Sequence, residues 1–278
     1  MTRRHFFTGS AAGLALGAVK LHADPLGLPI GCQLYPVRKA VGTDFEGTLR
    51  DLASIGYRTV EMCSPPGYAN SGFGTLIGMK PADLQSKIHA AGLRCESCHF
   101  QFTELKEHLD ERIGYASELG LKQMILASFG LRPEAGIDDW TKAAGELNRI
   151  GERVRKAGLQ LGYHNHNSEV SRIGGVLVYD RLMSAFDPQL VKLQFQVAVV
   201  SLGFDAVPFI DRNPGRFLSL HLQDWSAAEK KEVPIGQGSV DWKQLFTAAK
   251  KGGIKNYFVE MNMDALKASY PFLHQLKV

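Results

Sequence analysis

The chain has 278 residues, of which 45% are hydrophobic and 22% are charged, a composition typical of a globular protein that excludes extended disorder. The formal net charge is +4, but Arg3, Arg4 and Lys20 lie in the first 23 residues, which contain no acid, and removing these three from the 32 basic residues leaves 29 against 28 acidic ones. The remaining chain therefore has no excess of basic residues that would indicate a nucleic-acid partner.

Residues 1–23 have the order of a targeting segment. The charged stretch MTRRHFFTGS precedes the apolar run AAGLALGAV, which is too short to span a bilayer, and Ala23 is a small residue at a cleavage position. Residues 2–7 resemble a twin-arginine export signal. We therefore expect a twin-arginine-type signal peptide over 1–23, a periplasmic or otherwise exported protein, and no stable membrane insertion after the signal is removed.

A strand followed by an amphipathic helix repeats from residue 30 onward. Helical spacing of apolar residues precedes Gly56, Gly92, Gly120, Gly158 and Gly253, and a glycine after such a pattern is typical of a helix C-cap. Eight units of this kind predict a single-domain (β/α)8 TIM barrel over residues 24–278. The expected strands are 30–35, 59–63, 94–98, 123–127, 160–164, 192–196, 218–221 and 258–260.

Four cysteines, at positions 32, 63, 95 and 98, do not form a recognisable metal motif. Cys95 and Cys98 fall on a predicted strand, where odd spacing puts the two thiols on opposite faces, and no second pair of cysteines is present. We interpret all four as small residues of the hydrophobic core.

The strand ends carry an unusual set of polar side chains. In the stretch LGYHNHNSEV, His164 and His166 are two residues apart at the end of a predicted strand and therefore share a face. In a parallel barrel the carboxyl ends of all strands meet at one end, where active sites are found. The residues expected to meet there are Glu61, His99, His164, His166, Gln196, His221 and Glu260. Histidines and carboxylates on converging strands are typical of a divalent-metal site.

The sequence resembles the xylose-isomerase-like TIM barrel family, which includes sugar phosphate isomerases, epimerases and inosose dehydratase. The resemblance covers the whole chain after residue 25 and rests on motifs in order. These are GCQLYPVR, GYRTVEM, ESCHF, YHNHNSE, HLQDW, IGQGSVDW and FVEMN.

This resemblance implies a divalent metal bound by a Glu, an Asp, a His and a Glu on strands five to eight. His221 and Glu260 match the last two positions, whereas His164 stands at the position of the first Glu and Gln196 at that of the Asp. The implied metal ligands are therefore His164, Gln196, His221 and Glu260. Two imidazoles favour one transition metal (Mn, Co, Zn or Ni) over Mg or Ca.

The resemblance also implies chemistry that removes a proton next to a carbonyl. Glu260, His164 and His166 are the candidate catalytic groups, and the candidate substrate-binding residues are Glu61, His99, Glu169 and Gln223. Gln223 stands where the family usually has a lysine, and its presence removes a phosphate contact. Together with export, this indicates an unphosphorylated sugar or glycoside as the small-molecule partner.

Three functions remain open at this point. The first is a sugar isomerase or epimerase, and the second is a 3-keto-glycoside lyase, hydrolase or dehydratase that uses the same proton abstraction. The third is a barrel that binds sugar without catalysis, because fold alone does not guarantee activity. The sequence also leaves open whether copies associate into a homo-oligomer. Asp224 is expected to brace a loop, and Trp242 to pack on a helix face.

Overall fold

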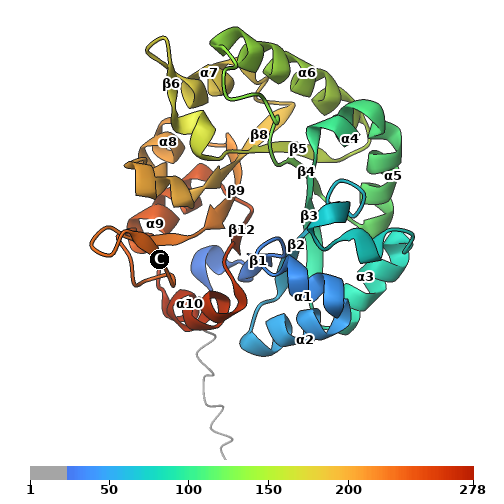
Figure 1. The fold of residues 1–278 in the computed structure, drawn as a ribbon. Helices are drawn as coiled ribbons and strands as arrows, with labels where there is room; N and C mark the ends of the chain where they lie inside the picture. Colours follow the sequence, from blue (N-terminus) through green and yellow to red (C-terminus); the bar gives the residue numbers. More distant parts are fainter. Residues whose placement is uncertain (1–23) are drawn as a thin grey trace, which may run out of the picture.

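The computed structural model describes residues 24–278, and the predicted targeting segment 1–23 lies outside the described residues. Eight parallel strands form a closed barrel in the order β1-β12-β9-β8-β5-β4-β3-β2, and helices surround it (Figure 1). The barrel strands are β1 Gly31–Gln33, β2 Thr59–Cys63, β3 Arg94–Phe100, β4 Gln123–Leu126, β5 Gln160–His164, β8 Val191–Gln196, β9 Phe217–Leu222 and β12 Asn256–Val259. The predicted (β/α)8 TIM barrel is confirmed.

The strand boundaries agree with the sequence pattern to within two residues in most cases. The strands predicted over 59–63 and 160–164 have those bounds, whereas β12 begins two residues before the predicted start and β1 is shorter than predicted at both ends. The predicted bounds rest on the alternation of side chains and the observed ones on ladder hydrogen bonds, and such criteria differ by one or two residues at the ends of an element.

The helices cover the outer face of the barrel. The five helices with a long apolar repeat are α2 Phe45–Ile55, α3 Pro81–Ala90, α5 Leu109–Leu119, α6 Ile137–Lys156 and α9 Trp242–Gly252. The others, which the sequence analysis did not identify, are α1 Arg38–Thr43, α4 Phe102–Glu107, α7 Val178–Ala185, α8 Ala206–Arg212 and α10 Met263–Gln275. Four of these five have eight residues or fewer, which is too short for helical periodicity to stand out.

Glycine ends the predicted helices for a conformational reason. Gly120 and Gly253 are the C-caps of α5 and α9, with φ of 80° and 73°, a left-handed conformation that other residues adopt at a cost. Each glycine turns the chain from a helix into the next strand.

The short elements lie in the connections between strands and helices. Two antiparallel hairpins pair β6 Arg172–Ile173 with β7 Val176–Leu177, and β10 Asp224–Ser226 with β11 Lys231–Val233. The 3-10 turns are η1 Pro25–Gly27, η2 Ala69–Ser71, η3 Gly74–Leu76, η4 Asn167–Val170 and η5 Val197–Leu202.

The core is apolar outside the barrel and polar at its centre. Large side chains such as Tyr57, Phe195 and Phe246 are fully buried, and the four cysteines are buried and free, as predicted. No helix among residues 24–278 has both the length and the apolar character needed to cross a membrane.

Asp224 braces the β10–β11 hairpin, as the sequence predicted. Its buried carboxylate accepts hydrogen bonds from the backbone N–H groups of Trp225, Gly236, Gly238 and Val240, and from the indole N–H of Trp242, at 2.9–3.3 Å. One side chain thus joins the carboxyl end of β9 to the start of α9.

We predict that Asp224→Ala lowers the free energy of unfolding by roughly 3 kcal/mol, because it leaves several buried donors without a partner. Asp241→Ala is the matched control, since Asp241 is an exposed N-cap that accepts only from the Gln244 N–H, and a lost cap costs about 1 kcal/mol. Urea unfolding measures both. Equal losses in the two variants would contradict the bracing role.

Candidate functional site

The polar interior of the barrel is organised around Glu61, the third residue of β2. Its side chain has no exposed surface. Oε1 accepts from Ser97 Oγ at 2.5 Å and from Gln194 Nε2 at 2.9 Å, and Oε2 accepts from Gln33 Nε2 at 2.8 Å. Two imidazoles also reach Oε2, with His221 Nε2 at 2.5 Å and His99 Nε2 at 3.1 Å. Glu61 therefore contacts only protein donors among the described residues, and its contact with substrate hydroxyls stays a prediction.

His221 lies between two carboxylates. Its Nε2 meets Glu61 and its Nδ1 lies 3.0 Å from Glu260 Oε2. Burial alone would lower the pKa of this imidazole, but the charges of Glu260 and Glu61 raise its pKa to about 10. Conversely, burial would raise the pKa of Glu260, but His221 lowers it, so Glu260 is ionised near neutral pH.

His164 is the neutral member of the site. Burial lowers its pKa well below 6.5, and the neighbouring His221, His166 and His99 lower the pKa further. Its Nδ1 is buried and has no hydrogen-bond partner among the described residues. A buried nitrogen without a partner is costly, and it indicates a missing ligand at this atom.

Three histidines from different strands come together here. The ring centroid of His164 lies 5.0 Å from that of His99 and 4.5 Å from that of His221, and the rings of His99 and His221 are stacked at 5.1 Å. One ligand atom from each lies within 4.8 Å of the others, which forms a group that could hold a metal ion. Three imidazoles with one unpartnered nitrogen fit a transition metal.

The metal ligands implied by the sequence are only partly in this cluster. His164 and His221 belong to it, and Glu260 touches it through His221. Gln196 lies beside Glu260, to which its amide N–H donates, but its amide oxygen accepts from the Ala198 N–H and therefore faces its own chain. The strand register that pairs Gln196 with His221 places both at the same level.

Glu169 and His166 belong to the turn after β5. The Glu169 carboxylate has no exposed surface and accepts from the His166 N–H at 2.9 Å, from Ser168 Oγ at 2.7 Å and from the Tyr163 hydroxyl at 2.5 Å. These bonds hold η4 and direct the exposed His166 ring, whose centroid lies 4.8 Å from that of His164. Glu169 therefore contacts protein groups here, while His166 has exposed surface beside His164.

Gln223 lies at the end of β9, outside the histidine cluster. Its amide donates to Glu232 on β11, which joins the hairpin to the barrel end. Of the predicted substrate-binding residues, the structure thus places His99 in the histidine cluster, Glu61 and Glu169 in buried networks, and Gln223 on the hairpin.

Sequence reasoning did not identify the buried amides and hydroxyls beneath the cluster. Gln194 donates to Glu61 and to Ser219 Oγ at 2.9 Å, and its Oε1 lies 2.7 Å from His99 Nε2. The sequence pattern that could have identified them is the polar face of each strand. The four residues Gln33, Ser97, Gln194 and Ser219 lie on it together with the predicted site residues.

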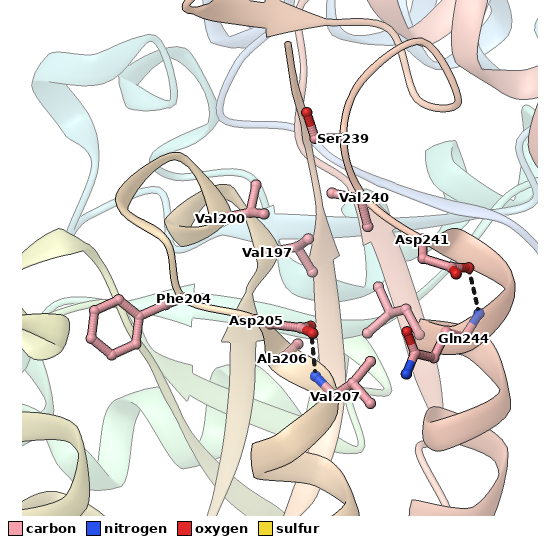
Figure 2. A pocket seen from close by; sticks show the side chains of 11 residues that line it. Val197, Val200, Phe204, Asp205, Ala206, Val207, Ser239, Val240, Asp241 and Gln244 are labelled. Atoms are coloured by element: carbon pink, nitrogen blue, oxygen red, sulfur yellow. Dashed lines mark hydrogen bonds between the residues drawn. The ribbon is translucent and has the colours of Figure 1, made fainter. Parts of the chain in front are cut away.

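A separate pocket of about 180 Å³ lies near the starts of α8 and α9 (Figure 2). Its walls include Val197 and Phe204, and its polar residues include Asp205 and Asp241. Both carboxylates are N-caps, with bonds to the N–H groups of Val207 and Gln244. The acidic residues of this pocket thus have a structural role.

Comparison with protein families identifies the fold independently. A profile described as "Xylose isomerase-like TIM barrel" matches residues 49–270. Among solved structures, a sugar phosphate isomerase/epimerase from Parabacteroides distasonis ATCC 8503 is 24% identical, covers 94% of this chain and 96% of its own, and has a TM-score of 0.75. An L-ribulose 3-epimerase is 16% identical, with coverage of 89% and 94% and a TM-score of 0.66. At these identities the two structures support the fold alone.

Curated relatives carry one shared name. An inosose dehydratase from Lacticaseibacillus casei is 29% identical over 54% of this chain and 55% of its own length, so the chain spans about half of that relative. An inosose dehydratase from Geobacillus thermodenitrificans (strain NG80-2) is 26% identical over 79% of this chain and 87% of its own.

We predict that the metal-free protein loses stability as the pH rises from about 6.5 towards about 10. The raised pKa of His221 means that the folded state holds a proton which the unfolded chain releases near 6.5, so the stabilisation is complete below 6.5 and is lost as the pH passes about 10. Urea unfolding across this range measures the effect after removal of metal by chelator. His221→Gln is the comparison, and an identical slope in both proteins would contradict the assignment.

Proposed function

Because the chain belongs to the xylose isomerase-like TIM barrel family, we propose that it is an enzyme that removes the proton next to the carbonyl of an unphosphorylated sugar or related polyol ketone. The observation that carries the proposal is the neighbourhood of Glu260. This ionised carboxylate sits beside three clustered histidines at the carboxyl end of the barrel, and 16% of its side chain is exposed.

The proposed cofactor is one divalent transition metal (Mn, Co, Zn or Ni), held by His164 and His221 together with His99 or Glu260. When bound, such an ion polarises a carbonyl and stabilises the negative charge that develops on its oxygen. The nitrogen ligands favour these metals over Mg or Ca. His164 supports this assignment because its lowered pKa keeps the ring neutral, with one nitrogen lone pair available for a ligand, at neutral pH.

Glu260 is the proposed base. Its ionised carboxylate accepts the proton from the carbon next to the carbonyl. His166 has exposed surface, although partial desolvation of its ring lowers its pKa below 6.5, and it is the second group able to exchange a proton with substrate. Glu61 and Glu169 are buried and hydrogen-bonded to protein donors. Of the three glutamates predicted at the site, Glu260 alone has a partly exposed carboxylate.

The number of open carboxylates distinguishes two reactions that both begin with abstraction of the proton next to the carbonyl. Epimerisation or isomerisation by two carboxylates needs a second one on the opposite face of the substrate. Elimination needs one base and an acid for the departing oxygen, a pairing that Glu260 and His166 provide. The relatives named inosose dehydratase support elimination, either as dehydration or as loss of a glycoside leaving group. Isomerisation or epimerisation remains the alternative, with His166 or His164 in the role of the second carboxylate.

The substrate is proposed to be unphosphorylated. Gln223 stands where the family usually has lysine, and its amide is bonded to Glu232, an arrangement that offers no cation to a phosphate. The twin-arginine pattern of residues 1–23 supports export of the protein and thus an extracytoplasmic sugar or glycoside.

We predict about one transition metal per chain in protein purified without residues 1–23, and its loss on treatment with chelator. His164→Ala and His221→Ala are each expected to lower metal occupancy, since each removes one imidazole from the cluster. Elemental analysis measures this. His108→Ala is the control, because His108 is an exposed histidine outside the site. Protein that stays metal-free after reconstitution would contradict the metal-assisted mechanism.

We also predict that the enzyme exchanges the hydrogen next to the carbonyl of an accepted keto-sugar, inosose or 3-keto-glycoside for deuterium in D2O. Glu260→Gln should slow this exchange by roughly 10²–10⁴-fold, the usual contribution of a general base. Glu104→Gln is the control, a buried carboxylate that caps α4.

The products, followed by NMR, separate the functions. Release of water or of an aglycone identifies elimination, and a new stereoisomer or a shifted carbonyl identifies epimerisation or isomerisation. Binding of the ketone with no exchange and no sensitivity to chelator would replace the enzyme proposal with a sugar-binding barrel.

A further inference from the structure

The protons on the histidine ring nitrogens can be placed from the hydrogen-bond network below them. Gln194 donates both amide hydrogens, one to the Glu61 carboxylate and one to Ser219 Oγ. An ionised carboxylate accepts only, so the orientation of this amide is fixed. Its oxygen, Gln194 Oε1, then faces His99 Nε2 at 2.7 Å and needs a donor there. His99 therefore carries its proton on Nε2, and its lone pair in the neutral ring is on Nδ1.

His221 is fixed in the same sense. Its Nε2 meets Glu61 Oε2 at 2.5 Å, at a carboxylate that is fully buried and held by other protein donors. Its Nδ1 meets Glu260, whose side chain is partly exposed. A metal bound to this ring would therefore take the place of the proton on Nδ1, because Glu260 on that side is partly exposed, whereas Glu61 on the other side is buried and held by Gln33, Ser97 and Gln194.

The third ring agrees with the first two. His164 Nδ1 is the buried nitrogen without a partner among the described residues. Each of the three histidines thus has Nδ1 as the atom available for a ligand. Glu61 is the partner of the opposite nitrogen in His221, and in His99 it lies 3.1 Å from that nitrogen and holds Gln194, which is the hydrogen-bond partner.

We propose that Glu61 is a positioning residue that accepts the Nε2 proton of His221 directly and fixes that of His99 through Gln194, whose amide it orients, and that it thereby presents the Nδ1 atoms of both rings to the metal. It does so from within the barrel, without contact to substrate. The presence of a metal rests on the proposed function. The placement of the ring protons rests on the hydrogen bonds alone. Carboxylates that accept from the second nitrogen of a ligating histidine fix its tautomer and orientation, and their loss typically weakens metal binding by about 10–100-fold.

Two variants test this role. Glu61→Gln keeps the volume of the side chain but removes its charge. It also puts an amide NH2 group, which donates, where the surrounding donors need an acceptor. Glu61→Asp keeps the charge but withdraws it by one methylene, so that it no longer spans both rings, and it serves if Glu61→Gln does not fold. We expect Zn²⁺ dissociation constants, measured by competition with a chelator, to rise by about 10–100-fold in either variant. Glu104→Gln, another buried carboxylate, should leave the dissociation constant unchanged.

The second readout is the protonation of the rings. In ¹⁵N-histidine-labelled wild-type protein loaded with ¹¹³Cd²⁺, coupling to cadmium should appear on Nδ1, with Nε2 still protonated. Coupling on Nε2 of His99 or His221, or unchanged Zn²⁺ affinity in a folded Glu61 variant, would overturn the proposal.

Failure of the metal proposal is distinguishable. If the wild type binds no metal, the metal-free ¹⁵N spectrum still tests the positioning role. It should show Nε2–H on His99 in the wild type and a mixture of tautomers in Glu61→Gln, and identical spectra would overturn the inference.

Discussion

Burial of the Glu61 carboxylate is the constraint around which the interior of this barrel is built. An ion of this size loses several kcal/mol of hydration free energy when it enters a protein interior, and the loss is offset only if its lone pairs are hydrogen-bonded. Here the donors come from the strands β1, β3, β8 and β9. This requirement explains why amides and hydroxyls, rather than aliphatic side chains, fill the centre of the barrel.

The same carboxylate links the core to the chemistry at the barrel end. Its negative charge and that of Glu260 keep His221 positively charged in the metal-free protein, while His164, at a ring distance of 4.5 Å, stays neutral. Two histidines of one cluster thus differ in charge because one lies between carboxylates and the other is surrounded by imidazoles. A divalent metal bound in place of the proton on His221 would change the charge of the interior by one unit only, because one cation would take the place of another.

The alternation of side chains along the strands predicted which residues would meet, because the period of two is imposed by the backbone. It placed Glu61, His99, His164, His221 and Glu260 at one end of the barrel, and the structure brings them together. Alternation does not reveal depth along the strand or the number of donors around each group. The sequence therefore placed Glu61 and Glu169 at the site as substrate-binding residues beside the catalytic candidate Glu260, and it did not show that hydrogen bonds from the surrounding protein enclose the first two and leave the third partly exposed. Gln196, which was predicted as a metal ligand, instead accepts a backbone N–H of its own turn with its amide oxygen. This contact depends on the backbone path of η5, which the sequence pattern does not show either.

The pattern of carboxylates has a consequence for the direction of the chemistry. In a site with two opposed carboxylates either one can take or return a proton, so both faces of a planar intermediate are served. In this barrel the resemblance to the family puts His164 at the position of one of them, its pKa is well below 6.5, and its Nδ1 is buried without a partner among the described residues. A His164 that ligates the proposed metal would not be free to return a proton to the opposite face. Proton abstraction by Glu260 would then be completed by loss of a substituent on the neighbouring carbon, which returns no proton to carbon. The replacement of a glutamate by His164 is therefore the reason for which we propose elimination ahead of epimerisation.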